Sequence, residues 1–204
     1  MSGDSLPPLA PLPRMALVRG RLHELTGPAR HTLAARAAGV AMAEGPVLWL
    51  RPAWLTEGLC AQGLAGLMPD PGALVLVRCP KPVDVLWSAE EALRSGAVAL
   101  VIAELAEAPD LRQVRRLHLA AAEGVARGTP RGRAPLGLAL MAETADSRLA
   151  GVESRWALHP LPGAPARWRL DRLLARGLPP QDWEVRDLGS APAPGAGVAQ
   201  EEMA

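Results

Sequence analysis

The chain has 204 residues, a length that suits a single domain with a substantial hydrophobic core. Its formal net charge is only +1, so no overall field drives it onto nucleic acid or a membrane surface. Hydrophobic residues make up 49% of the chain, but prolines and charges interrupt them before a bilayer-spanning run can form. The amino-terminal prolines also break any signal-peptide pattern, so we expect a cytoplasmic protein without membrane contact.

The cysteines and histidines give no sign of a disulfide framework or a metal site. Cys60 and Cys79 stand alone, with no second cysteine or histidine at ligand spacing. The histidines lie in unrelated segments and lack the spacing of a catalytic triad. We therefore expect no metal, no cofactor, and two buried free thiols of the kind found in a reducing cytoplasm.

The first predicted segment is a proline-rich arm over residues 1–19, whose prolines forbid a helix and favour an extended path. The arm also carries large apolar residues, so we expect it to cover its own sheet or to lie on another protein. From residue 20 onward, short apolar runs alternate with segments of helical apolar periodicity. The expected strands are 21–26, 47–50, 74–77, 98–103 and 136–141, and the expected helices are 32–44, 53–66, 83–95 and 110–127.

This alternation predicts an α/β fold, in which a parallel sheet carries helices on both faces through right-handed crossovers. After residue 141 the pattern changes to weak alternation over residues 154–161, 167–174 and 181–188. We expect these segments to be antiparallel strands appended at the C-terminal edge of the sheet. Residues 189–204 have the composition of a disordered tail, which leaves 20–188 as the folded domain.

The turn between the first strand and the first helix is where nucleotide-binding α/β proteins hold phosphate. A P-loop needs the spacing G-x-x-x-x-G-K-[ST], because glycines let backbone N–H groups surround the phosphate and the lysine neutralises its charge. In this chain the first glycine is followed by neither a second glycine nor a lysine. The residues at the turn are Gly27, Pro28, Ala29, Arg30, His31 and Thr32. The turn therefore has the position of a P-loop without its chemistry.

Three stretches resemble the RecA-type ATPase core and, within it, the ImuA-like proteins of bacterial mutagenesis cassettes. Residues 20–28, GRLHELTGP, are similar to the strand and turn that enter the RecA-type P-loop. Residues 90–105, EEALRSGAVALVIAEL, are similar to the helix, turn and strand that end in the Walker B aspartate. Residues 167–185, RWRLDRLLARGLPPQDWEV, are similar to the closing segment of ImuA-like chains. The resemblance implies a RecA-like, mostly parallel sheet flanked by helices.

The resemblance assigns the functional positions of a RecA-type ATPase to residues of this sequence, and most of these residues differ from those that an ATPase needs. The Walker B carboxylate falls on Glu104, one methylene longer than aspartate. The catalytic glutamate position falls near residues 51–54, where no carboxylate exists, and the neutral sensor position falls near Glu143, an anion. Together these losses imply that hydrolysis has been abandoned.

Two interpretations remain open for each polar residue near the turn. Glu104 is either a residual metal ligand or, as is commoner for a carboxylate that ends an apolar strand, a solvated strand end. Arg30 and His31 either meet an anion at the helix N-terminus or form an exposed pair without function. For both sites the second interpretation is favoured.

A cluster of arginines predicts a basic ridge on the long helix and the loop after it. The ridge residues face away from the apolar stripe and offer contact with phosphates or with an acidic partner. They are equally typical of the solvated face of an arginine-rich chain, and no aromatic residue interleaves with them for base stacking. The ridge comprises Arg112, Arg115, Arg116, Arg131 and Arg133.

Partner binding is the function that this pattern favours. The resemblance implies two partners, an ImuB-like polymerase-family protein and an error-prone replicative-type DNA polymerase. RecA is a further candidate, and only weak DNA contact is expected. Trp168 and Trp183 are candidate anchors for such a partner, although core packing is the commoner role for tryptophans in strands. The expected function is thus a non-catalytic accessory role in damage-induced translesion synthesis. A RecA-family ATPase and a SulA-type cell-division inhibitor are the alternatives.

Overall fold

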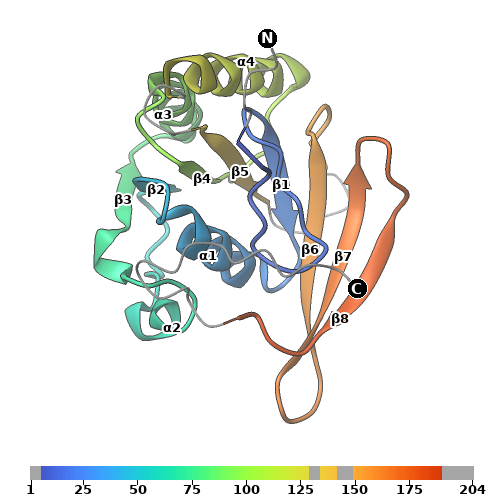
Figure 1. Ribbon diagram of the computed structural model, residues 1–204. Helices are drawn as coiled ribbons and strands as arrows, with labels where there is room; N and C mark the ends of the chain where they lie inside the picture. Colours follow the sequence, from blue (N-terminus) through green and yellow to red (C-terminus); the bar gives the residue numbers. More distant parts are fainter. Residues whose placement is uncertain (1–5, 129–133, 142–148, 190–204) are drawn as a thin grey trace.

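The computed structural model describes residues 6–128, 134–141 and 149–189. This part of the chain forms one eight-stranded sheet with the order β3-β2-β4-β5-β1-β6-β7-β8 (Figure 1). The strands are β1 (Leu22–Thr26), β2 (Val47–Pro52), β3 (Val75–Cys79), β4 (Leu100–Glu104), β5 (Leu136–Leu140), β6 (Ser154–Leu161), β7 (Arg167–Ala175) and β8 (Gln181–Val185). The helices are α1 (Arg30–Ala41), α2 (Ala61–Ala65), α3 (Pro82–Ser95) and α4 (Leu111–Gly128), with a short 3₁₀ turn η1 (Pro71–Ala73).

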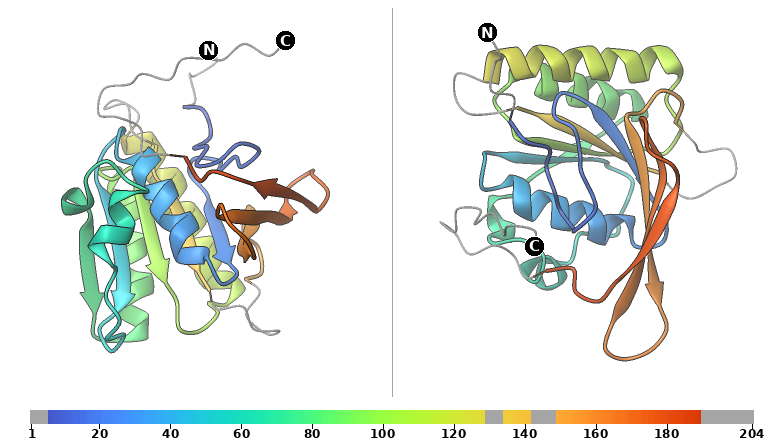
Figure 2. Two further views of the ribbon diagram at one scale, coloured as in Figure 1. Left: turned by 90° about the horizontal axis from the view of Figure 1, so that it is seen from below. Right: turned by 45° about the vertical axis from the view of Figure 1, so that its right-hand side comes forward.

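The predicted α/β fold, a mostly parallel sheet with flanking helices, is confirmed. Strands β3, β2, β4, β5 and β1 are parallel neighbours, and β7 and β8 add antiparallel strands at the far edge. Each central strand is buried on both faces, because α1 covers one side and α3 with α4 covers the other (Figures 1 and 2). In β4, for example, Leu100 and Ile102 pack with α1, whereas Val101 and Ala103 pack with α3 and α4.

The last two helices begin and end where the sequence predicts. Asp110 caps α4, since its Oδ1 accepts from the Gln113 backbone N–H at 2.8 Å while Gln113 Oε1 accepts from the Asp110 N–H. Gly96 ends α3 in the left-handed conformation at φ 65°. The two helices approach closely at Gly124, where a Cβ atom would lie 1.9 Å from the Leu93 carbonyl oxygen. A glycine at this point is therefore required by packing.

The helix expected over residues 53–66 is wrong in its extent. Only α2 forms there, and the chain around Trp54 is a turn in which the Leu55 N–H donates to the Pro52 carbonyl. Trp54 is 47% exposed, so its apolar character does not mark a buried helical face. Cys60, predicted to be buried, is exposed, whereas Cys79 is buried as expected.

The first of the appended strands is also oriented differently from the prediction. Strand β6 pairs parallel with β1, in a register that places Ser154 opposite His23, and antiparallel with β7, which in turn pairs antiparallel with β8. The sequence signals for turns near Gly163 and Gly177 fix the β6–β7 and β7–β8 hairpins. These turn signals carry no information about the neighbour of β6 on its other side, so they could not predict that β6 pairs parallel with β1.

The amino-terminal arm, residues 6–19 in the structure, packs on the chain's own core. It folds back on itself through an antiparallel bridge between Leu9 and Leu17, and it lies beside α1 and the β6–β7 strands (Figure 2). Met15 and Leu17 are 1% and 0% exposed. Arg19 forms a 2.5 Å ion pair with Glu44, just beyond α1. Of the two expected positions, own sheet or other protein, the arm takes the first.

A buried polar chain ties the arm to the sheet. Trp156 Nε1 donates to Ser154 Oγ at 2.8 Å, and Ser154 Oγ lies 2.7 Å from His23 Nδ1. His23 Nε2 lies 3.0 Å from the Val18 carbonyl oxygen, which only accepts, so the proton belongs on Nε2 and Ser154 donates to Nδ1. Burial lowers the pKa of His23 to about 4, although the hydrogen bond to Val18 opposes this shift.

The packing of the arm predicts that Leu17→Ala destabilises the whole domain. Removing a fully buried leucine side chain should lower the free energy of unfolding by about 3 kcal/mol. The neighbouring Val18→Ala is the matched control, because Val18 is 42% exposed and its loss should cost less than about 0.5 kcal/mol. Urea unfolding of both variants measures the difference. Equal, small effects would mean that the arm is detached from the core in solution.

The neutral state of His23 predicts an acid-sensitive fold. Its pKa is about 4 when folded and 6.5 in the unfolded chain, so as pH falls through this window only the unfolded state takes up the proton. The free energy of unfolding should therefore decline by about 3 kcal/mol between pH 6.5 and pH 4. His23→Gln, which cannot titrate, should show a shallower decline in urea unfolding across that range. Parallel pH profiles for the two proteins would contradict the assignment.

Candidate functional site

The candidate site lies at the carboxyl ends of the central parallel strands, where α/β folds bind ligands. Glu104 is the last residue of β4, Arg51 lies near the end of the adjacent β2, and His31 is in the first turn of α1. Strand pairing sets this arrangement, because β2 and β4 run side by side in parallel and end together. The same edge would hold a nucleotide in a RecA-type ATPase.

Glu104 is buried and fully engaged by neighbouring side chains. Its Oε1 accepts a 2.7 Å hydrogen bond from Trp49 Nε1, and Arg51 contacts both carboxylate oxygens at 3.4 Å. His31 Nε2 lies 3.5 Å from Oε2, and the imidazole stacks on the Trp49 indole with ring centroids 6.3 Å apart. The carboxylate thus has its partners within the protein.

These partners keep Glu104 ionised in a buried position. Burial raises the pKa of the carboxyl group, but hydrogen bonds from His31 and Trp49, together with the charges of His31 and Arg51, outweigh it and hold the pKa below its usual value. The charge is neutralised locally by Arg51, whose side chain is 8% exposed, like that of Glu104. An internal guanidinium therefore stands beside the carboxylate that would otherwise attract a divalent cation.

The β1–α1 turn is closed against phosphate. It consists of Gly27, Pro28 and Ala29 only, and the Ala29 N–H donates to the Leu158 carbonyl of β6 at 3.1 Å. Pro28 has no N–H to offer. Gly27 has φ 83°, and a Cβ there would lie 2.9 Å from the Leu158 oxygen, so packing against β6 explains the glycine.

The first residues of α1 complete this closure. Arg30 donates from both its backbone N–H and its guanidinium to the Gly27 carbonyl, at 3.3 and 3.2 Å. Thr32 lines a hollow of about 290 Å³ on one side of His31, and a second hollow of about 190 Å³ lies on the other side. Both volumes are below the roughly 300–1,000 Å³ of typical ligand pockets.

The exposure expected for these residues from the sequence is wrong. Glu104 is not a solvated strand end but a buried carboxylate with three side-chain partners. Arg30 and His31 are not fully exposed, since His31 is half-buried against Glu104 and Trp49 while Arg30 donates to the turn. Trp49 and Arg51 were not predicted as site residues from the sequence. A tryptophan in a buried strand needs an acceptor for its N–H, which was an available signal.

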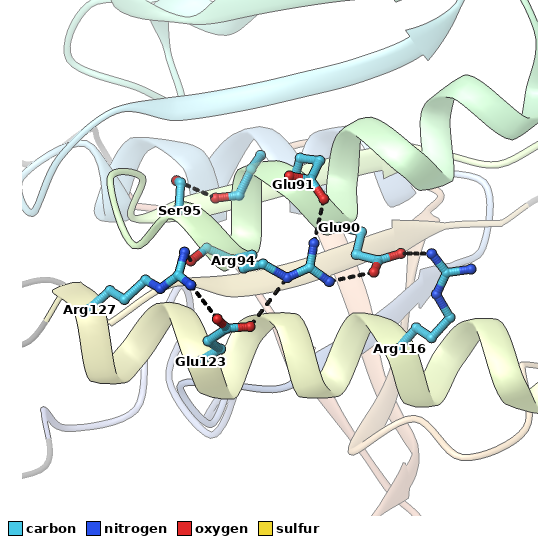
Figure 3. Close-up of polar contacts among 8 residues, drawn as sticks. Glu90, Glu91, Arg94, Ser95, Arg116, Glu123 and Arg127 are labelled. Carbon is cyan, nitrogen blue, oxygen red and sulfur yellow. Dashed lines mark hydrogen bonds and ion pairs between the residues drawn. The ribbon is translucent and has the colours of Figure 1, made fainter.

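The arginine ridge is partly neutralised by carboxylates of α3. Arg116 contacts Glu90 at 2.6 Å, and Arg94 joins Glu90, Glu91 and Glu123 into a network between the two helices (Figure 3). Arg112 and Arg115 are exposed, and no carboxylate of the described residues pairs with them. Arg131 and Arg133 lie outside the described residues. Of the three ridge arginines that the structure describes, Arg116 is therefore paired and Arg112 and Arg115 are not.

The two tryptophans predicted as partner anchors already pack on the domain. Trp168 and Trp183 are both half-buried against the core cluster that contains α1 and the arm. Trp183 stacks on Trp156, with centroids 6.2 Å apart, and carries the Arg172 guanidinium 5.2 Å from its ring centroid. Core packing is the contact that the structure gives them.

Within the described ranges, no group of three or more His, Cys, Asp or Glu side chains is arranged to hold a metal ion. Within the same ranges, no helix combines the length and apolarity needed to cross a bilayer.

Comparison with known proteins finds a solved structure that shares the fold and curated relatives that identify the family. The chain superimposes on the RadB recombinase with a TM-score of 0.57 at 16% sequence identity, covering 81% of this chain and 86% of that one. No family model matches the sequence. The ImuA proteins of two strains of Caulobacter vibrioides are 32% identical over 167 residues, which is 76% of this chain and 67% of each relative. The chain belongs to the ImuA family.

The site predicts that Glu104 and Arg51 depend on each other for stability. Glu104→Gln leaves the Arg51 guanidinium buried without its countercharge and should lower the free energy of unfolding by about 3 kcal/mol. Arg51→Met likewise leaves the Glu104 carboxylate buried without its countercharge. The double variant should be less destabilised than the sum of the two, by at least about 1 kcal/mol. Urea unfolding of all four proteins gives this cycle, and strict additivity would show that the pair is not coupled.

Proposed function

We propose that this protein is a non-catalytic accessory protein of DNA-damage-induced translesion synthesis (SOS mutagenesis), and that it acts by binding other proteins. Its partners are an ImuB-like polymerase-family protein and an error-prone replicative-type DNA polymerase, with RecA as a further candidate. Membership of the ImuA family supports the process. The observation that carries the non-catalytic role is the Arg51–Glu104 pair at the nucleotide edge of the sheet.

The physical case against hydrolysis rests on what phosphoryl transfer requires. Catalysis of this reaction comes from positioned cations, a phosphate cradle and a residue that orients water. In this chain the Ala29 N–H of the β1–α1 turn already donates to the Leu158 carbonyl of β6. The Glu104 carboxylate is neutralised by Arg51, and the sequence has no lysine near the turn. To bind Mg-ATP here, the protein would have to break its own ion pair and expose a buried carboxylate.

The proposal predicts that partner binding is independent of nucleotide. Calorimetric titration with Mg-ATP should show no binding tighter than about 1 mM, because the described residues of the turn form no phosphate cradle and the Arg30 guanidinium is already bound to the Gly27 carbonyl. Co-expression with the ImuB-like protein should yield a complex whose recovery is the same with and without Mg-ATP. Glu104→Gln serves as the control for hydrolysis, since any phosphate release should be unchanged by it.

Three outcomes would overturn the proposal. Micromolar Mg-ATP binding would place the chain among the ATP-binding members of the RecA superfamily. Phosphate release that is abolished by Glu104→Gln would make it an ATPase. Failure to recover the ImuB-like protein, with the chain folded by circular dichroism, would remove the partner on which the accessory role depends.

A further inference from the structure

The outer side of the α3–α4 pair carries a groove with an exposed tryptophan. Trp87 and Val83, one turn apart on α3, are 62% and 61% exposed. A hollow of about 130 Å³ lies beside Trp87 and reaches Arg116 on α4. A second hollow of about 220 Å³ shares Val83, Leu86 and Gln113 as walls and continues toward Pro109 at the carboxyl edge of the sheet, where Glu104 and Glu107 also line it. Together they form one groove, called here the α3–α4 groove.

The walls of the groove are held in place before any partner arrives. Arg94 of α3 binds Glu90 and Glu91 on its own helix and Glu123 on α4, and Arg116 of α4 binds Glu90 (Figure 3). Burial raises the pKa of Glu90, but the hydrogen bonds from Arg94 and Arg116 outweigh it and lower the pKa, so the network stays charged at neutral pH. A preformed groove avoids the entropy cost of ordering its side chains on binding.

Exposed arginines on the α4 side give the Trp87 end of the groove a preference for acidic groups, whereas Glu107 lines its Pro109 end. Arg112 and Arg116 lie one turn apart along α4, and Arg115 adjoins them. No carboxylate within the described ranges pairs with Arg112 or Arg115, and Arg116 stays 62% exposed although it contacts Glu90. An exposed tryptophan beside arginines is the combination that dominates binding energy in protein interfaces.

We propose that the α3–α4 groove binds an acidic segment of a partner protein. Apolar side chains of that segment fill the hollows beside Trp87 and Val83, while its carboxylates meet Arg112, Arg115 and Arg116. The inference deepens the proposed function, since it rests on this chain acting by binding proteins and names the surface that does so.

Nucleic acid fits this surface less well than an acidic peptide. Glu91 and Glu123 lie on the same surface as the arginines, so a continuous row of phosphates would pass close to carboxylates. Peptide carboxylates can be spaced to avoid them. Most of the lining of the hollows is aliphatic or indole, which suits apolar side chains, but Glu90, Glu104 and Glu107 also line them and disfavour phosphates there. A single tryptophan gives no platform for successive bases.

A synthetic peptide tests the groove directly. The probe is a fluorescein-labelled peptide of about twenty residues with Leu and Glu at helical spacing, so that one face is apolar and its borders are acidic. Two control peptides replace every Leu by Ser or every Glu by Gln, and an oligothymidylate of about twenty nucleotides represents nucleic acid. Fluorescence anisotropy measures binding to the full chain, and analytical ultracentrifugation measures its oligomeric state.

The variants separate the apolar and the charged contributions. Trp87→Ala and the double variant Arg112→Glu/Arg115→Glu should each weaken binding of the Leu/Glu peptide about ten-fold, and the charge variant should also reduce the salt dependence. Leu178→Ala and Arg186→Glu are matched controls, because both side chains are exposed in or beyond the β7–β8 hairpin. Trp87 is largely exposed, so Trp87→Ala should not unfold the chain. Circular dichroism of the variant checks this.

Several results would overturn the assignment. These are no binding of the Leu/Glu peptide by the unaltered chain, equal binding by Trp87→Ala, or equal binding of the Gln peptide. Tighter binding of oligothymidylate through the same arginines would make the surface a nucleic-acid site, and a dimer lost in Trp87→Ala would make it a self-interface.

The proposed function has a separate test, the recovery of the ImuB-like protein. Peptide binding that responds to the variants, without that recovery, supports the groove and removes the proposed function. Recovery of the ImuB-like protein, together with peptide binding that the variants do not change, supports the proposed function and removes the groove.

Discussion

The structure depends on the neutralisation of one buried carboxylate at the end of the central strand β4. Glu104 is reached by Trp49 and Arg51 from β2 and by His31 from α1, so three elements are tied at the point where the parallel strands end. Ionised groups are tolerated inside a protein only when they are paired and hydrogen-bonded. This requirement explains why an arginine lies near the end of β2 and why the first turn of α1 carries a histidine that faces Glu104.

The two faces of the sheet have different surroundings. On the α1 face, the amino-terminal arm and the strands β6 and β7 bury a large apolar cluster that includes Met15, Leu17 and Trp156. On the opposite face, α3 and α4 complete the second cluster and leave their outer side exposed, with Trp87 projecting from it. The proposed contact surface thus lies on a helical pair that its own packing keeps ordered, which lowers the entropy cost of binding.

The sequence predicted those parts of the fold that local patterns determine. Apolar runs and helical periodicity located β1, β2, β4, β5, α3 and α4, because each of these elements buries side chains at a regular spacing. The limits of α2 were misjudged, since Trp54 is apolar but exposed. The parallel pairing of β6 was also missed, because it is a contact between strands more than a hundred residues apart and no local signal encodes it.

At the candidate site, the sequence established which groups were missing but not how the remaining ones are arranged. The absence of a P-loop lysine and of a second glycine could be read directly from residues 27–33. The position of Arg51 was noted only as the lack of a carboxylate. That its guanidinium meets Glu104 follows from the register of β2 against β4, which is a tertiary property.

The ion pair between Arg51 and Glu104 also constrains which substitutions this edge of the sheet tolerates. To place a divalent cation beside Glu104, Arg51 would have to be removed, and its removal alone leaves a buried carboxylate without its countercharge. A chain with only that change is therefore expected to be less stable than the present one. The residues at positions 51 and 104 are thus expected to change together or not at all.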